Sequence, residues 1–141
     1  MQYTLQGIVK FILDKIKSTN NGVMFFLQGD LGVGKTYLVR EVAKYLKIKD
    51  KITSPTFLIL KDYQIPGDSR LLVHVDFYRF LDSFDQSVLD QIGFFDYAGN
   101  DVVFIEWPEI VQSHLPEDLV KQAVKIKITK DEWGNRIYQV E

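Results

Sequence analysis

The chain has 141 residues, no cysteine and a formal net charge of −2 at pH 7. This length suits one domain covering residues 1–141, and the lack of cysteine excludes a disulfide framework and a thiolate metal site. The pI of about 5.7 argues against autonomous nucleic-acid binding through a broad basic face. Because the sequence shows neither a membrane-span pattern nor a signal-peptide pattern, we expect a cytoplasmic protein without a membrane partner.

The N-terminal third predicts a helix, a buried strand and a second helix. Apolar residues recur at helical spacing over residues 4–17, which indicates an amphipathic helix. The polar segment 18–22 ends that helix, and a continuous apolar run then predicts a strand over residues 23–28. Apolar residues with a 3.6-residue period predict the next helix, which ends at about Leu46.

The segment between this strand and this helix, residues 29–36, reads GDLGVGKT and fits the phosphate-binding pattern G-x-x-x-x-G-K-[ST]. Glycines allow the backbone N–H groups to converge on phosphate oxygens at a helix N-terminus. Lys35 supplies a positive charge for the β- and γ-phosphates, and the Thr36 hydroxyl is suited to ligate Mg²⁺. We therefore expect an ATP/ADP and Mg²⁺ site. The expected nucleotide contacts are Asp30, Leu31, Gly32, Val33, Gly34, Lys35, Thr36 and Tyr37.

The middle of the chain predicts a loop and two strands. Residues 53–57 contain a proline and indicate a bent loop that feeds a strand at about 57–63. The Pro-Gly-Asp sequence within residues 64–70 predicts a turn. An apolar run over residues 71–75, ending in Asp76, predicts a second buried strand.

Two short helical segments and a third buried strand are expected next. Asp82 or Ser83 is suited to cap a helix that runs through Leu89, and residues 93–100 form a turn or a short helix. The apolar run 102–105, followed by an acidic residue and then by proline, predicts a buried strand that ends there.

The C-terminal segment predicts an antiparallel hairpin. Residues 116–118 indicate a turn, and a strand is expected near residues 119–129 because apolar and charged residues alternate. A turn at 131–135 leads to a strand over 136–140. The whole pattern predicts an α/β P-loop NTPase fold with this hairpin at its end.

Two acidic residues at strand ends are candidates to complete the site. Mg²⁺ needs a carboxylate in or near its coordination shell, and the strand ends of an open α/β sheet line the ligand crevice. Glu106 ends its strand in the manner of a Walker B motif and is the favoured metal ligand, directly or through water. Asp76 is suited to help hold Mg²⁺ or to position the attacking water. The sequence leaves open which of the two orients that water.

Other residues have both a functional and a structural interpretation. His74 shares a strand face with the acid two residues later, and is either a supporting group or a buried structural histidine. Arg79 is suited either to contact the γ-phosphate or to pair with an acid. Trp107 either stacks on a base or fills the core. Ser54 and Thr56 lie in a segment that is either a γ-phosphate-sensing switch or a connector.

Four stretches together resemble the bacterial tRNA threonylcarbamoyladenosine biosynthesis ATPases, the TsaE family. They are GDLGVGKT at 29–36, SPTF at 54–57, HVDFYR at 74–79 and IEWPE at 105–109. The first stretch is common to very many NTPases, whereas the other three in this order are far more specific. Val33 and Tyr37 depart from the residues usual in the family, which are smaller, and the region 84–100 matches only loosely.

The resemblance implies a compact P-loop ATPase, with a mainly parallel central sheet flanked by helices and antiparallel strands at its margins. It also implies an activity that is weak alone and is stimulated by TsaD and TsaB. That complex modifies adenosine 37 of tRNAs that read ANN codons, so tRNA is an indirect partner. By motif position, the resemblance implies catalytic roles for Lys35, Asp76 and Glu106, with Thr36 and Glu106 at the metal. It also implies that Trp107 and the loop 54–57 lie near the nucleotide or at the partner surface.

These observations predict a Mg²⁺-dependent ATPase that turns ATP into ADP and phosphate within a tRNA-modification system. One alternative is a small-molecule kinase, which usually carries an arginine-rich lid; the chain has only four scattered arginines. The other alternative is a nucleotide-gated switch, in which occupancy matters more than turnover. The sequence does not settle the oligomeric state or which surface meets a partner.

Overall fold

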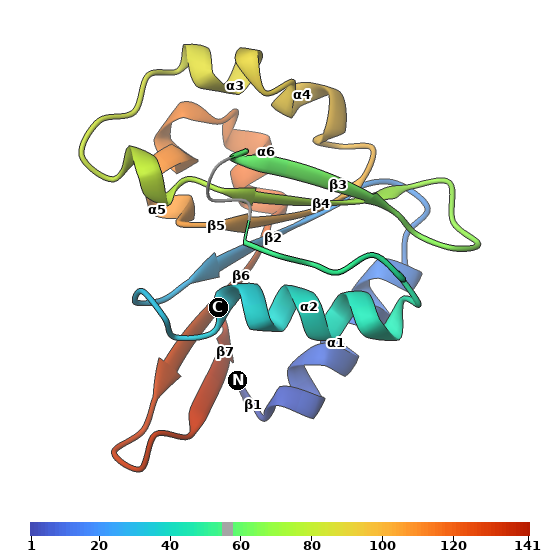
Figure 1. Cartoon of the computed structure of the whole chain (residues 1–141), viewed down its shortest axis with the longest axis vertical. Coiled ribbons are helices and arrows are strands. Elements are labelled where there is room, and N and C mark those ends of the chain that lie inside the picture. The colour runs from blue at the N-terminus through green and yellow to red at the C-terminus, as the bar shows by residue number, and fades with distance from the viewer. Residues whose placement is uncertain (55–57) are drawn as a thin grey trace.

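The computed structural model describes residues 1–54 and 58–141 (Figure 1). The strands are β1 (Gln2–Tyr3), β2 (Val23–Gln28), β3 (Leu60–Gln64), β4 (Leu71–Asp76), β5 (Val102–Glu106), β6 (Val124–Lys130) and β7 (Arg136–Val140). The α-helices are α1 (Leu5–Lys17), α2 (Lys35–Tyr45), α3 (Ser87–Gln91), α4 (Phe94–Tyr97), α5 (Pro108–Val111) and α6 (Glu117–Gln122). The described residues also form two 3₁₀ turns, η1 (Tyr78–Phe80) and η2 (Gln112–His114).

The strands form one mixed sheet in the order β1-β7-β6-β2-β5-β4-β3. The central strand β2 pairs in parallel with both β5 and β6, and β5 pairs in parallel with β4. The outer pairs β3–β4, β6–β7 and β1–β7 are antiparallel. The predicted α/β fold, with a parallel centre, antiparallel margins and a C-terminal hairpin, is therefore confirmed.

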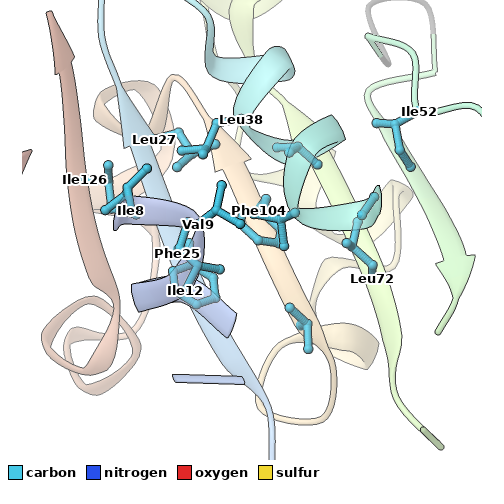
Figure 2. Close-up of a cluster of buried hydrophobic side chains, with 14 of the residues drawn as sticks. Ile8, Val9, Ile12, Phe25, Leu27, Leu38, Ile52, Leu72, Phe104 and Ile126 are labelled. Atoms are coloured by element: carbon cyan, nitrogen blue, oxygen red, sulfur yellow. The ribbon is translucent and has the colours of Figure 1, made fainter. Parts of the chain in front are cut away.

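Hydrophobic cores fill both faces of this sheet, with α1 and α2 on one side and α3, α4 and α6 on the other (Figure 1). Successive residues of β2 point to opposite faces: Phe25 packs in the α1–α2 core, and Phe26 packs in the other. Figure 2 shows the first core, where Phe25 stacks on Phe104 of β5 with ring centroids 4.9 Å apart. Burial on both faces explains why the central strands are continuous apolar runs.

The parallel register brings the ends of three strands to one edge of the sheet. Glu106 is level with Leu27 of β2 on one side and with Asp76 of β4 on the other. The loop 29–34, which follows β2 and precedes α2, starts at this same edge. Both candidate acids therefore lie beside that loop, as expected for strand ends in an open α/β sheet.

The predictions of helix 4–17, strand 23–28, the helix after the loop, and the strands at 71–76, 102–106 and 136–140 are confirmed. The predicted helix starting at Asp82 or Ser83 is wrong in its start, because α3 begins at Ser87. The Asp85 carboxylate accepts the Ser87 N–H at 2.9 Å and fixes this start. The preceding residues instead continue the η1 turn, where Ser83 N–H donates to the Phe80 carbonyl.

The predicted strand over 119–129 is wrong in its first part, where α6 occupies residues 117–122 and β6 begins only at Val124. The turn predicted at 116–118 is instead the start of this helix. Pro116 occupies the N-cap position of α6. Two acids lie in the first turn of the helix, where their negative charge interacts favourably with the helix dipole. Lys121 and Glu117 form an i,i+4 ion pair at 3.2 Å.

The strand predicted at 57–63 begins at Leu60, and residue 57 lies outside the described residues. Ile59 has a φ of 65°, a left-handed conformation that interrupts strand geometry just before β3. The sequence analysis missed β1, α5 and both 3₁₀ turns. In the described part of the chain, no helix is both long enough and apolar enough to cross a membrane.

Candidate functional site

The loop 29–36 joins β2 to α2 with a backbone that only glycine adopts easily. Gly34, which precedes α2, has a φ of 115°. A Cβ on Gly29 would lie 2.7 Å from the Ile128 carbonyl oxygen of β6, so glycine is also required by close approach. The loop is thereby held against the sheet, with its N–H groups near the positive end of α2.

Lys35 is buried at the first position of α2, where its ammonium group remains within the loop. It donates to the carbonyl oxygens of Gly29 and, at 3.3 Å, Asp30. It also lies 3.9 Å from the ring centroid of Trp107. Burial lowers the pKa of Lys35, and neighbouring carboxylates, of which Glu106 acts most strongly, oppose that shift.

Glu106 is almost fully buried and binds two side chains through one oxygen. The Thr36 hydroxyl donates to Glu106 Oε2 at 2.6 Å, and His74 Nε2 lies 2.5 Å from the same atom. Because a carboxylate only accepts, the imidazole proton is assigned to Nε2. His74 Nδ1 is buried without a hydrogen-bond partner among the described residues. His74 thus fixes the orientation of Glu106 from inside the sheet.

Asp76 lies beside Glu106 and is also buried, with 7% of its surface exposed. Its Oδ1 accepts the Tyr78 N–H at 2.9 Å, and its Oδ2 lies 3.4 Å from the Ser54 hydroxyl. Burial raises the pKa of Asp76, and the neighbouring charge of Glu106 raises it further. The two carboxylates therefore have different surroundings: one is bound by side chains, and the other faces a backbone N–H and a hydroxyl.

Trp107 follows Glu106 in a left-handed conformation, with a φ of 61°, and is the N-cap residue of α5. Such a conformation is costly for a non-glycine residue and often marks a functional site. The ring contacts the Lys35 ammonium, and its centroid lies 5.2 Å from that of the Tyr78 ring. Trp107 is therefore a wall of the site and is not a residue of the deep core.

These groups surround a pocket of about 320 Å³. Its lining residues are Leu31, Gly32, Gly34, Lys35, Thr36, Tyr37, Ser54, Asp76, Tyr78, Glu106 and Trp107. Three separate stretches of the sequence analysis, namely the loop 29–36, the strand end at Asp76 and the strand end at Glu106, therefore meet in one place. Tyr78 was missed, although it lies within the HVDFYR stretch.

The remaining candidates lie elsewhere. Asp30 and Val33 line a neighbouring pocket between the loop and β6, and His74 is buried behind Glu106. Arg79 does not line the 320 Å³ pocket in the described part of the chain; its guanidinium lies 6.0 Å from the Phe80 ring centroid. Thr56 lies outside the described residues.

The residues present fit a magnesium ion. Thr36 and Glu106 supply hydroxyl and carboxylate oxygens, which Mg²⁺ prefers, and they are already adjacent at 2.6 Å. No group of three or more His, Asp or Glu side chains suited to hold a metal occurs among residues 1–54 and 58–141. Mg²⁺ is usually bound by one or two carboxylates together with waters and phosphates, so the hydroxyl and carboxylate of Thr36 and Glu106 match its usual protein ligands.

Comparison with known proteins identifies the family. The family model "Threonylcarbamoyl adenosine biosynthesis protein TsaE" matches residues 5–138. The chain belongs to the TsaE family. The tRNA threonylcarbamoyladenosine biosynthesis protein TsaE of Treponema pallidum is 38% identical over 122 residues, which cover 82% of this chain and 78% of that protein.

Two further TsaE relatives are matched over a smaller share of their length. The Haemophilus influenzae protein is 36% identical over 100 residues, covering 70% of this chain and 60% of the relative. The Bacillus subtilis protein is 34% identical over 105 residues, covering 74% and 62%. The match to these two therefore spans less than two thirds of their length. The crystal structure of Bacillus subtilis YdiB has the same fold, with a TM-score of 0.67 at 24% identity, over 99% of this chain and 83% of that one.

Proposed function

We propose that this TsaE-family chain binds Mg-ATP in the 320 Å³ pocket and hydrolyses it to ADP and phosphate. The observation that carries the proposal is the meeting of Lys35, Thr36 and two buried carboxylates around one glycine-rich loop. A buried cation and convergent N–H groups suit polyphosphate, and paired acids suit its metal and the attacking water.

Lys35 and the loop would bind the β- and γ-phosphates. The Lys35 ammonium is partly desolvated and contacts loop carbonyls and an aromatic face, so it can exchange these contacts for phosphate oxygens. Its charge then offsets the negative charge that develops as the γ-phosphoryl group is transferred.

Thr36 and Glu106 would hold Mg²⁺, the latter directly or through water. These two residues would place a positive charge beside the phosphates, and the metal would supply charge neutralisation there. His74 would hold Glu106 Oε2 in place, since His74 Nε2 already binds that oxygen inside the sheet.

Asp76 would orient the attacking water. Glu106 is engaged by Thr36 and His74, whereas Asp76 lines the pocket and its Oδ2 lies 3.4 Å from the Ser54 hydroxyl. The raised pKa of Asp76, due to burial, makes its carboxylate a better proton acceptor than a solvent-exposed aspartate. Water would then attack in line with the bond to the departing ADP.

The biological setting would be tRNA threonylcarbamoyladenosine biosynthesis, the process named in the relatives that the chain matches. We propose that the chain acts with TsaD and TsaB, and that tRNA is reached through that complex. A net charge of −2 is consistent with an auxiliary protein that does not bind RNA strongly by itself.

The test is phosphate release from Mg-ATP by the purified chain, alone and with TsaD and TsaB, next to a Lys35→Ala variant. The proposal expects slow release alone, stimulation by the partners, and loss of both in the variant. Tight ATP binding without turnover in any setting would favour a nucleotide-gated switch. Turnover that requires a small-molecule acceptor would favour a kinase.

A further inference from the structure

A residue far from the glycine-rich loop in sequence contacts that loop from outside the pocket. Arg136, the first residue of β7, donates from Nε to the Val33 carbonyl oxygen at 2.9 Å. Its guanidinium carbon also lies 4.9 Å from the ring centroid of Tyr37 in α2. The side chain is thus held between the loop and the first turn of the helix that follows it.

The contact is close enough to depend on glycine. A Cβ on Gly34 would lie 2.7 Å from Arg136 Nε and 3.2 Å from both Cδ and Cζ. Gly34 therefore both lines the pocket and packs against the arginine. Glycine at this position therefore leaves room for the Arg136 side chain and also permits the positive φ of the backbone.

The hydrogen bond to Val33 has a consequence for the next N–H group. In a trans peptide, the carbonyl of one residue and the N–H of the next point in opposite directions. Because Arg136 binds the Val33 carbonyl, the Gly34 N–H points away from Arg136. Gly34 itself lines the pocket, so this orientation would make its N–H available to a phosphate there. A rotated peptide would instead present a carbonyl oxygen to the phosphates, which repel it.

The hairpin turn before Arg136 fixes the position at which β7 begins. One Asp131 oxygen accepts the backbone N–H groups of Trp133, at 2.9 Å, and Asn135, at 2.8 Å. Arg136 then pairs with Lys130 across the hairpin. Figure 1 shows this β6–β7 hairpin standing beside the loop that precedes α2.

We propose that Arg136 is a positioning residue of the nucleotide site: it orients the Val33–Gly34 peptide and so ties phosphate affinity to the C-terminal hairpin. This inference rests on the proposed binding of ATP and ADP in the same pocket. The arginine acts through the loop backbone and not through contact with the phosphates.

The test compares Arg136→Gln and Arg136→Lys with Lys127→Gln, which removes one positive charge from the same hairpin beside the loop. Calorimetry gives the Kd for Mg-ADP, and NMR follows the Gly34 amide resonance. We expect Arg136→Gln to weaken ADP binding by about 3- to 10-fold, the size of one lost hydrogen bond. Arg136→Lys should lose less, and Lys127→Gln should stay within about twofold of the unsubstituted chain.

The change in the Gly34 amide chemical shift on ADP addition should be smaller in Arg136→Gln than in the unsubstituted chain. The melting temperature of Arg136→Gln without nucleotide should match that of Lys127→Gln. Equal ADP affinity in Arg136→Gln and Lys127→Gln, with an unchanged Gly34 shift, would overturn the inference alone. A loss of affinity that accompanies general unfolding would also overturn it, because the role would then be structural. No ADP binding by the unsubstituted chain would overturn the proposed function and this inference together.

Discussion

The Thr36 hydroxyl donates a 2.6 Å hydrogen bond to Glu106 Oε2 and so joins the start of α2 to the end of β5, 70 positions along the chain. His74 holds the same oxygen from the neighbouring strand β4. One carboxylate at the end of β5 therefore binds side chains from α2 and β4. Substitution of that carboxylate should reduce the rate of ATP hydrolysis far more than the affinity for nucleotide.

Glu106→Gln should lower kcat for ATP hydrolysis by about 100-fold or more, a loss of the size seen when one group that stabilises transition-state charge is removed. The amide keeps the volume of the carboxyl group but is a poor Mg²⁺ ligand. ADP binding without Mg²⁺ should stay within about threefold, since Lys35 and the loop are unchanged. Phosphate release with the partner proteins and calorimetry with EDTA measure the two effects. Turnover at the unsubstituted rate would exclude Glu106 from the reaction.

Asp76→Asn should stop hydrolysis but stabilise the fold at neutral pH. The folded-state pKa of Asp76 is raised by burial and by Glu106, so its ionised form opposes folding. This penalty is absent below the unfolded pKa of about 3.8 and complete above the folded pKa. The variant should therefore gain about 1 kcal/mol at pH 8, or a few degrees in Tm, and nothing near pH 3.5.

The measurement is the Tm of Asp76→Asn and of the unsubstituted chain across this pH range. Asp50→Asn, at an exposed loop position, is the control for the loss of one negative charge. A gain in Tm that is largest at low pH would contradict the assigned burial penalty.

Gly34→Ala should destabilise the chain by about 1–3 kcal/mol, because its φ of 115° is strained for alanine and its Cβ would meet Arg136. Gly67→Ala is the matched control: Gly67 also has a positive φ, of 77°, but a Cβ there has nothing within 4 Å. Urea unfolding of both variants separates backbone strain from the clash. Equal losses in the two variants would show that the Arg136 contact adds nothing.

Trp107 should report nucleotide binding by fluorescence, because Lys35 lies 3.9 Å from its ring and would move toward the phosphates. The other tryptophan, Trp133, is 77% exposed at the hairpin turn, and Trp133→Phe removes its signal. Addition of ADP to this single-tryptophan chain should change the emission in a saturable way. Unchanged emission at ADP concentrations that saturate the site by calorimetry would contradict the predicted movement of Lys35.

The sequence predicted most of the sheet because its central strands are apolar runs that end at an acid or a glycine. It also predicted that Asp76 and Glu106 would meet, since parallel strand ends share one edge of the sheet. The α6 helix was predicted as strand because Leu119 and Val120 lie shortly before an alternating segment, and no glycine or proline separates the two. The start of that helix depends on Pro116 and on two acids in its first turn.

Arg136 illustrates what pattern analysis does not reach. Nothing around it in sequence marks a site, since it begins an ordinary hairpin strand. Its place beside Val33 follows from the pairing of β6 with β2 and of β7 with β6. Such a contact depends on sheet order, which local periodicity does not encode.

Calorimetric titration of the purified chain with ATP, with Mg²⁺ and next to Lys35→Ala, tests the nucleotide site most directly, because it needs no partner. We predict saturable binding at one site per chain, weakened about tenfold or more in the variant, since Lys35 supplies a desolvated charge to the phosphates. No measurable binding at millimolar ATP, or equal affinity in Lys35→Ala, would contradict the assignment of this pocket to ATP.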